Sequence, residues 1–325
     1  MKPPFHPNFD RMDALSQERM PFFFIADFLM HRVEVYTIAE LCSNEIRISF
    51  PKFSHYCSVE PVDSSLNMQA FPETIDDYKK GFRTVQDNLK FGNSYLMNYT
   101  RKTEITVDRT LDEIFHLVEA KYKVLYRDMF VFFSPETFIE IAGDRIFTHP
   151  MKGTIDASLP NAAEALKNDK KEKAEHYTVV DLLRNDLSMV ADDVQLDAFQ
   201  RIDFIKTRQK DLFAMSSEIS GKLKPEFNGK VGSILKTLLP AGSILGAPKK
   251  KTLEILLEAE KYDRGFYTGV CGWFDGANLD SCVMIRFMEK EGDKLYFKSG
   301  GGITHLSRLE DEYEEMKNKI YVPVP

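Results

Sequence analysis

Lys152 is the first residue whose type and position indicate chemistry. It precedes a glycine in the segment HPMKGT, residues 149–154, where a predicted strand runs into a loop. A surface lysine would need no special explanation. A lysine that faces a pocket must pair with an anion, or it loses its proton and becomes a nucleophile. Lys152 is therefore a candidate for anion binding or for nucleophilic catalysis.

The segment SRLEDEYEEMKNKI, residues 307–320, combines acidic side chains with lysine. Ser307 to Glu310 has the form of a capping box, which predicts a helix that starts there. Glu312, Glu315 and Lys319 follow at spacings that place them on one helix face. This face is either a solvated acidic surface or, if an anion site lies beside it, one wall of a site for a divalent metal.

Three consecutive glycines, Gly300, Gly301 and Gly302, precede this helix in the segment KSGGGITH. Successive glycines allow backbone N–H groups to converge on an anion without obstruction by side chains. A sharp turn would also use glycine, but three glycines exceed what one turn requires. We therefore expect a carboxylate-binding loop beside the acidic helix, with a divalent metal between the two.

Arg286 interrupts the apolar run SCVMIRFM, at a strand position that a hydrophobic residue would normally fill. Its guanidinium cannot lose its charge, so the side chain either meets an anion or extends from an edge strand into solvent. The run itself supports both interpretations equally.

A second segment with glycines, LPAGSILGAPKKK, leads into a predicted helix that starts at Pro248 and runs to about Glu260. Three lysines, Lys249, Lys250 and Lys251, crowd the positive end of that helix, where the helix dipole disfavours cations. We expect an acidic side chain or a ligand to compensate for one of them and solvent to suffice for the other two.

Composition limits the class of protein. The chain has 325 residues, 43% of them apolar, with a formal charge of -7 and a pI near 5.6, which argues against a surface built to bind nucleic acid. No stretch approaches the ~20 apolar residues of a membrane span, and the N-terminus lacks the apolar region of a signal peptide. The four cysteines form no CxxC pair or dense disulfide pattern. We expect a cytoplasmic protein with no nucleic-acid or membrane partner.

Secondary structure is predicted in blocks of strands and helices, which favours an α+β fold with antiparallel sheets. Helices are expected over residues 75–89, 111–122 and 161–189. The last third is typical of a strand meander, with the β-rich runs FYTGVCGWFDG, LDSCVMIRFMEKEG and DKLYFKSGGG. No repeat or linker divides the chain, so we expect one domain over residues 1–325.

Taken together, these segments resemble the chorismate-utilising enzymes: anthranilate synthase component I, aminodeoxychorismate synthase component I, and the isochorismate and salicylate synthases. The resemblance extends from about Gly92 to Lys319, in order and at fitting separations. It implies the fold of that family, antiparallel sheets packed together and flanked by helices, and chorismate as the substrate. Its motifs are GNSYLMNYT, SPETF, HPMKGT, KAEHYTVVDLLRNDL, LPAGSILGAPK, RGFYTG, MIRF and GGGITHLSRLEDEYEEMKNK.

The resemblance also implies a Mg²⁺ ion that bridges the enzyme and the ring carboxylate of chorismate. Glu175 and Glu315 match the metal-ligand positions and Glu312 lies close by, an oxygen ligand set that suits Mg²⁺. The matching substrate-binding positions are Tyr267, Arg286, Gly300, Gly301, Gly302, Lys319, Thr154 and Gly246.

At the position of Lys152, anthranilate synthases carry alanine, whereas many aminodeoxychorismate synthases carry lysine. The resemblance to this subgroup implies that Lys152 attacks C2 of chorismate as the C4 hydroxyl leaves, and that ammonia then enters at C4 and expels the lysine. Glu136, in SPETF, would protonate the leaving hydroxyl. None of the cysteines lies in the G-x-C-x-G motif of a glutaminase, so a separate glutamine amidotransferase subunit is the expected source of ammonia.

The expected function is therefore aminodeoxychorismate synthase component I, in 4-aminobenzoate and folate synthesis. No segment matches the tryptophan-binding region of feedback-inhibited anthranilate synthases, which favours this branch. The alternatives are anthranilate synthase component I, an isochorismate or salicylate synthase that uses water as the nucleophile, and a non-catalytic subunit of the same fold. Three residues depart from the usual family pattern: Ala214 replaces a histidine, Leu245 a threonine, and His176 an asparagine.

Overall fold

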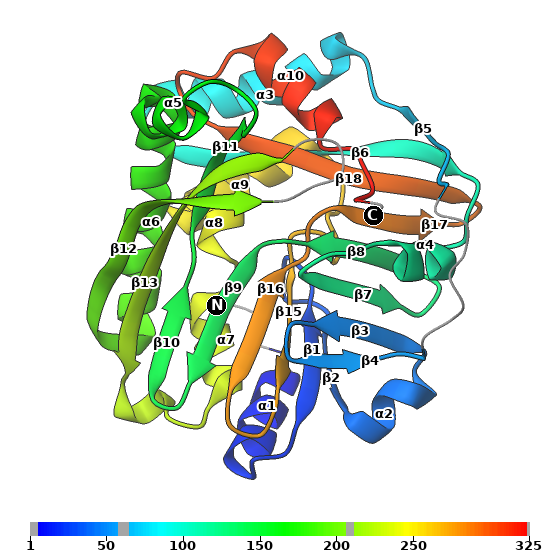
Figure 1. The fold of residues 1–325 in the computed structure, drawn as a ribbon, viewed down its shortest axis with the longest axis vertical. Helices are drawn as coiled ribbons and strands as arrows, with labels where there is room; N and C mark the ends of the chain where they lie inside the picture. The colour runs from blue at the N-terminus through cyan, green and yellow to red at the C-terminus, as the bar shows by residue number, and fades with distance from the viewer. Residues whose placement is uncertain (1–5, 58–64, 206–210, 324–325) are drawn as a thin grey trace.

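The strands form two antiparallel sheets that pack on each other. The computed structural model describes residues 6–57, 65–205 and 211–323, and within these ranges each sheet has nine strands (Figure 1). The strand order of the first sheet is β11 (Met151–Asp156), β13 (Leu212–Leu223), β10 (Arg145–Thr148), β9 (Thr137–Ala142), β16 (Leu279–Val283), β15 (Val270–Phe274), β1 (Phe22–Ala26) and β2 (Val33–Thr37), and β12 (Ala191–Ile205) pairs with β13.

The second sheet contains the glycine-rich strand β18. Its strand order is β14 (Gly246–Ala247), β6 (Leu96–Val107), β18 (Lys294–Ile303), β17 (Phe287–Glu291), β8 (Phe130–Ser134), β7 (Tyr122–Tyr126), β3 (Ile46–Phe50) and β4 (Phe53–His55), and β5 (Met68–Phe71) pairs with β6. The two sheets share a hydrophobic core. Phe23 and Trp273 of the first sheet pack in it with Ile48 and Phe132 of the second, and burial of such apolar surface is the main stabilising contribution.

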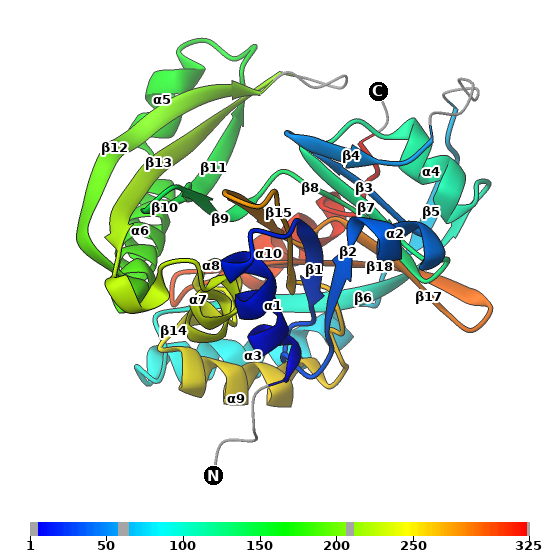
Figure 2. The ribbon, with the colours of Figure 1, turned by 90° about the horizontal axis from the view of Figure 1, so that it is seen from below.

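Helices cover the outer faces of both sheets (Figure 2). The long helix α6 packs against β12 and β13, and α3, α9 and α10 lie against β6 and β18. The helices are α1 (Asn8–Gln17), α2 (Ile38–Ser43), α3 (Ile75–Lys90), α4 (Leu111–Leu117), α5 (Ala162–Asn168), α6 (Lys170–Val190), α7 (Val231–Leu238), α8 (Gly242–Leu245), α9 (Lys249–Glu260) and α10 (Leu309–Asn318), with a 3₁₀ turn at Pro225–Phe227. The expected α+β fold with antiparallel sheets is confirmed.

Helix α3 illustrates how the sequence determines these elements. Thr74 caps its N-terminus by accepting a hydrogen bond from the backbone N–H of Asp77 at 3.3 Å. Tyr78, Phe82 and Val85 recur at helical spacing and are buried against β6 and α9. The helix starts where the sequence predicts.

Several predicted boundaries are wrong. Helix α4 ends at Leu117, because Tyr122 already belongs to β7, and the predicted helix over residues 161–189 is divided at Asp169, which caps α6. The capping box at the start of α10 does not form. The hydroxyl of Ser307 instead accepts from the backbone N–H of Thr304 at 3.1 Å, and the helix begins after Arg308.

The chain passes between the two sheets at two neighbouring places. Strand β8 of the second sheet continues into β9 of the first, and β16 of the first continues into β17 of the second. Because β9 pairs with β16 and β8 pairs with β17, the two crossovers lie side by side. The run LDSCVMIRFMEKEG is therefore two strands in different sheets, and Arg286 lies between them. No helix in the described ranges is long and apolar enough to cross a membrane.

Candidate active site

A cavity of about 140 Å³ lies where the two sheets meet. Strands β9 and β11 of the first sheet, β18 of the second sheet and helix α6 all contribute to its wall. Most of the residues that the sequence indicates are brought together here. Those that line the cavity are Glu136, Lys152, Tyr267, Arg286, Gly300, Gly301, Gly302 and Lys319.

Glu136 and Arg286 occupy the two crossovers. Glu136 lies between β8 and β9, and Arg286 lies between β16 and β17 with a left-handed φ of +51°. Few residues other than glycine adopt this conformation, which is common at functional sites. The edge-strand interpretation of Arg286 is therefore wrong, since this residue is outside both strands and its side chain lines the cavity.

The carboxyl group of Glu136 is surrounded by donors and positive charges. Ser243 donates a hydrogen bond to Glu136 Oε1 at 2.8 Å. Burial raises the pKa of Glu136, and the Ser243 hydrogen bond and the charges of Lys152, Lys319 and Arg286 partly oppose this rise. A carboxyl group with a raised pKa retains its proton to higher pH, as a general acid requires.

Lys152 extends from the first sheet toward the glycines of the second. It lies on β11 opposite Met215, and the strand register shifts immediately after it, at Gly153 with φ +75°. A Cβ atom on Gly302 would lie 3.5 Å from Lys152 Nζ. The amine therefore faces the floor of the cavity, where a ring bound over the glycines would meet it.

The three glycines lie within β18, paired with β6 in a regular ladder, so the expected carboxylate-binding loop is wrong. Their role is to leave the cavity floor without side chains. A Cβ atom on Gly301 would lie 3.0 Å from Glu315 Oε1 and 3.4 Å from Glu312 Oε2. A Cβ atom on Gly300 would lie only 2.4 Å from the backbone oxygen of Tyr99.

Helix α10 brings two carboxylates and a lysine to the other side of this floor. Glu312 is buried and Glu315 is more exposed, and both lie against Gly301. Lys319 Nζ donates to the backbone oxygen of Gly300 at 2.9 Å and to Glu315 Oε1 at 2.7 Å. The helix face predicted from the spacing of these side chains therefore meets the glycine strand.

This pair of carboxylates fits a magnesium ion. Mg²⁺ is typically held by one or two carboxylates, with water and substrate oxygens completing its coordination. Glu175 lies on α6 one turn before Val179, which lines the cavity. In the described ranges no three His, Cys, Asp or Glu side chains are close enough to form a complete metal site. Glu312 and Glu315 are thus brought together beside Gly301, and Glu175 lies on α6, a helix that contributes to the cavity wall.

Two of the expected substrate-binding residues are placed differently. Gly246, with φ +104°, does not line the cavity, and a Cβ atom there would lie 1.8 Å from the backbone oxygen of Leu96. Its role is to allow β14 to approach β6. The backbone of Thr154 lies on β11, but its side chain is outside the described part of the structure.

The sequence did not indicate Ser243, although it lies in the motif LPAGSILGAPK. The sequence also did not indicate that His176 is near enough to Lys152 to feel its charge. The imidazole of His176 is buried, and its Nε2 lies 2.7 Å from Ser217 Oγ. Burial, together with the charge of Lys152, lowers the pKa of His176 to about 4, so the ring is neutral at physiological pH.

A second cavity shares one wall residue, His149, with the first. His149 Nε2 lies 3.3 Å from Glu140 Oε2, and its Nδ1 lies 3.7 Å from Glu218 Oε2. Besides Glu140 and Glu218, this cavity is lined by Asp275, Asp280 and Lys52. The first cavity is thus rich in cations and the second in carboxylates.

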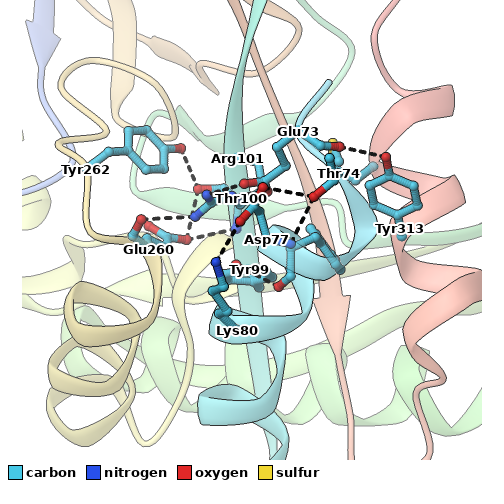
Figure 3. Close-up of polar contacts among 12 residues, drawn as sticks. Glu73, Thr74, Asp77, Lys80, Tyr99, Thr100, Arg101, Glu260, Tyr262 and Tyr313 are labelled. Atoms are coloured by element: carbon cyan, nitrogen blue, oxygen red, sulfur yellow. Dashed lines mark hydrogen bonds and ion pairs between the residues drawn. The ribbon is translucent and has the colours of Figure 1, made fainter. Parts of the chain in front are cut away.

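A polar network connects β6, the strand that pairs with the glycine strand, to α9 and α10 (Figure 3). The carboxylate of Glu260, at the end of α9, accepts from the backbone N–H and the hydroxyl of Thr100 on β6, both at 2.8 Å. Arg101 follows on the same strand and pairs with Glu73. Tyr313 of α10 donates to the backbone oxygen of Glu73 at 2.7 Å, which completes the connection.

Comparison with known sequences defines the family. The family model for chorismate binding enzymes matches residues 20–325. An uncharacterized PabA-like protein from Haemophilus influenzae is 47% identical over 315 residues, covering 97% of this chain and 96% of that protein. Anthranilate synthase component 1 from Arthrobacter globiformis is 36% identical over 200 residues, covering 59% of this chain and 36% of that protein. The chain belongs to the chorismate-binding enzyme family.

Solved structures share the fold at lower identity. The menaquinone-specific isochorismate synthase from Escherichia coli has a TM-score of 0.72 at 15% identity, covering 96% of this chain and 79% of that chain. Anthranilate synthase component I from Streptococcus pneumoniae has a TM-score of 0.67 at 24% identity, covering 80% of this chain and 60% of that chain. The expected fold of the chorismate-utilising enzymes is confirmed.

Proposed function

We propose that the protein is a chorismate-aminating enzyme of the aminodeoxychorismate synthase component I type, which forms 4-amino-4-deoxychorismate from chorismate and ammonia. One observation carries this proposal. A primary amine, Lys152, lies in the same cavity as Glu136, a carboxyl group whose pKa is raised by burial. The proposed reaction adds a nucleophile at one ring carbon while a hydroxyl leaves another. It therefore requires a nucleophile and an acid that face the same substrate.

The remaining cavity residues suit a dianion with a flat ring. Arg286 and Lys319 supply fixed positive charge for two carboxylates, and Tyr267 contributes a buried ring to the wall. The floor formed by Gly301 and Gly302 lets the substrate approach the backbone closely. A bound Mg²⁺ would be held by the carboxylates of Glu175, Glu312 and Glu315 and would neutralise the ring carboxylate.

The chemistry proceeds in two displacements. Lys152, as the free amine, attacks C2 of chorismate, the ring double bond shifts, and the C4 hydroxyl leaves as water with a proton from Glu136. Ammonia then attacks C4, the double bond shifts back, and the amine of Lys152 leaves C2. The proton released by the incoming ammonia restores Glu136, so each turnover consumes one ammonia and releases one water.

Ammonia is proposed to come from a separate glutamine amidotransferase subunit. The carboxylates Glu140, Glu218, Asp275 and Asp280 make the second cavity a favourable environment for ammonium, whereas Lys152, Arg286 and Lys319 make the first unfavourable for it. The carboxylates of the second cavity would attract ammonium, and this supports ammonia as the second reactant. Isolation of the protein from its source cell together with a glutaminase would agree with this partner.

Anthranilate synthase component I is the second candidate, since such an enzyme is 36% identical over 200 residues. An isochorismate or salicylate synthase and a non-catalytic subunit of the same fold remain as further alternatives. Product analysis separates all four. The purified protein is incubated with chorismate, Mg²⁺ and an ammonium salt, with and without EDTA, and the products are resolved by mass. Metal-dependent 4-amino-4-deoxychorismate supports the proposal, whereas anthranilate, isochorismate, salicylate or no turnover contradicts it.

A further inference from the structure

The side chain that contacts Glu136 belongs to a segment that has little stability of its own. Ser243 lies on α8, a helix of four residues. Helix formation is costly to initiate, so a single turn is not stable in isolation. The position of Ser243 against Glu136 must therefore be set by contacts with the rest of the protein, which include polar contacts at the two ends of this segment and the burial of Ile244 and Leu245 within it.

Asp186 of α6 fixes the start of α8. Its buried carboxylate accepts a hydrogen bond from the backbone N–H of Gly242, the first residue of α8. A Cβ atom on residue 242 would lie 2.5 Å from Asp186 Oδ2, so glycine is needed for this approach. Leu183, three residues before Asp186 on α6, lines the active-site cavity. The same helix thus forms a wall of the cavity and anchors the segment behind it.

Lys249 closes the segment from its other end. Its Nζ lies 2.8 Å from Asp186 Oδ2 and donates to the backbone oxygen of Leu238 at 2.7 Å. Leu238 ends α7 and Lys249 starts α9, so one ammonium joins the two ends of residues 238–249 around the Asp186 carboxylate. Asp186 also supplies the anion that the sequence requires for one of the three lysines. Charge-assisted hydrogen bonds of this kind are strong and directional.

We infer that Asp186 and Lys249 are positioning residues that hold the Ser243 hydroxyl in hydrogen-bond contact with Glu136. Neither residue is among those that line the described cavity, so each acts through the backbone of α8. The inference rests on the proposed function, in which Glu136 is the acid. It connects the motif LLRNDL, which contains Asp186, to the acid through the motif LPAGSILGAPK, whose Ser243 contacts Glu136.

The expected effect is a change in the pH dependence of turnover. Ser243 donates to the carboxylate form of Glu136 and lowers its pKa, so loss of this hydrogen bond raises that pKa. Glu136 acts when protonated, and turnover falls as pH rises through its pKa. The falling limb of the kcat profile therefore moves to higher pH. The other charged groups that face Glu136, which are Lys152 from β11, Arg286 from the β16–β17 crossover and Lys319 after α10, stay in place.

The test compares Ser243→Ala with a double variant, Asp186→Leu with Lys249→Met. The double variant leaves no unpaired buried charge, so it is expected to fold. Both changes should move the falling limb to higher pH with the KM for chorismate unchanged, and Ser243→Thr should restore the original profile. In the Ser243→Ala background, the double variant should add no further shift. Lys251→Met, which removes an exposed pair with Glu254 on the same helix, is the matched control.

A second measurement does not depend on turnover. The carboxyl band of Glu136 is followed against pH by infrared difference spectroscopy, with Glu136→Gln as the reference and no substrate present. The double variant should raise the titration midpoint of this band, and only when Ser243 is present. An unchanged midpoint, or an equal rise without Ser243, overturns the positioning role even where chorismate is aminated. A protein that makes no aminated product overturns the proposed function, and the infrared result still decides whether Asp186 and Lys249 act through Ser243.

Discussion

Glu136 and Arg286 are linked to each other's crossover by their backbone oxygens. The N–H of Val283 donates to the oxygen of Glu136 at 3.1 Å, and the N–H of Phe133 donates to the oxygen of Arg286 at 3.2 Å. Each bond joins one crossover to the strand at the start of the other. The acid and the guanidinium are therefore both held by backbone contacts within the two crossovers, where the two sheets meet.

Replacement of Lys152 tests the proposed nucleophile. Lys152→Ala removes the amine that faces Gly302 and should lower ammonia-dependent formation of 4-amino-4-deoxychorismate by about 100-fold or more, as loss of a covalent nucleophile does. Residual product should shift toward anthranilate, because ammonia can then enter only at the carbon that the lysine no longer occupies. The measurement is product analysis at saturating ammonium.

The matched control for this variant is Lys222→Ala, which removes an exposed lysine of β13 that pairs with Asp144 away from the cavity. Intact-protein mass spectrometry of quenched reactions should detect a chorismate-derived adduct on the wild type and on the control, but not on Lys152→Ala. Full aminating activity of Lys152→Ala would falsify the covalent role.

Substitution of two neighbouring glycines of β18 should affect thermal stability at one position and ligand binding at the other. In Gly300→Ala the new Cβ atom meets the backbone oxygen of Tyr99 at 2.4 Å, which the sheet can relieve only by moving, at a cost of about 1–3 kcal/mol. In Gly301→Ala the new atom meets the end of the flexible Glu315 side chain at 3.0 Å. Gly300→Ala should therefore lower the Tm, and Gly301→Ala should mainly raise the concentrations of Mg²⁺ and chorismate required for turnover. The reverse pattern would show that the floor of the cavity is formed by another segment.

The sequence predicts the fold class and most of the charged residues that line the cavity. These residues can be recognised because their sequence neighbours do not explain their charge. Arg286 in an apolar run and Lys152 before glycine each required a partner, and both line one cavity with Glu136. The acidic face of α10 lies against Gly301. These inferences needed only residue type and spacing. The resemblance to a family then placed them around one substrate.

What the sequence could not predict depends on long-range contacts. The sequence predicts a loop at the glycines, because their pairing with β6 involves residues about 200 positions earlier in the chain. The sequence predicts a strand position for Arg286, because nothing local shows that the chain changes sheets there. Ser243 has an ordinary sequence context, and its role follows only from Glu136, 107 residues away.

Glu136 should lower the stability of the protein at neutral and alkaline pH. Its folded-state pKa is raised, so the folded protein binds this proton more tightly than the unfolded chain does. Its favourable contribution is complete below the ordinary pKa of a glutamate and is lost as pH rises through the raised value. The Tm of Glu136→Gln should therefore exceed that of the wild type by more at pH 8 than at pH 4, and the variant should have no turnover. Thermal unfolding of both proteins at the two pH values is the measurement, and a pH-independent difference in Tm would contradict the explanation.

Removal of one acidic side chain of α10 tests the metal site. Glu315→Gln keeps the volume of the side chain but removes a charge beside Gly301, and should weaken Mg²⁺ binding by about tenfold or more. Calorimetric titration of the metal-free protein with Mg²⁺ measures this without substrate. Glu314→Gln, one residue earlier and paired with Lys317 on the exposed side of α10, is the control and should bind Mg²⁺ as the wild type does.

Breaking the buried pair of Glu260 with Arg264, which follows α9, should cost more stability than breaking an exposed pair between β6 and β18. The side chains are 2% and 1% exposed, and Glu260 also accepts two hydrogen bonds from Thr100 (Figure 3). Glu260→Gln leaves the arginine without its counter-charge, which costs about 3–5 kcal/mol in buried pairs. Glu104→Gln, which removes an exposed pair with Lys294, should cost less than about 1 kcal/mol.

Urea unfolding of both variants and the wild type measures this difference. The midpoint should fall further in Glu260→Gln than in Glu104→Gln. Because Thr100 pairs with Gly300 across the ladder, movement of β6 in Glu260→Gln should also displace the glycine floor. When assayed at a low temperature at which it remains folded, Glu260→Gln should therefore show a higher KM for chorismate than the wild type. Glu104→Gln should show an unchanged KM. Equal midpoints for the two variants would mean that the network of Figure 3 does not fix this strand.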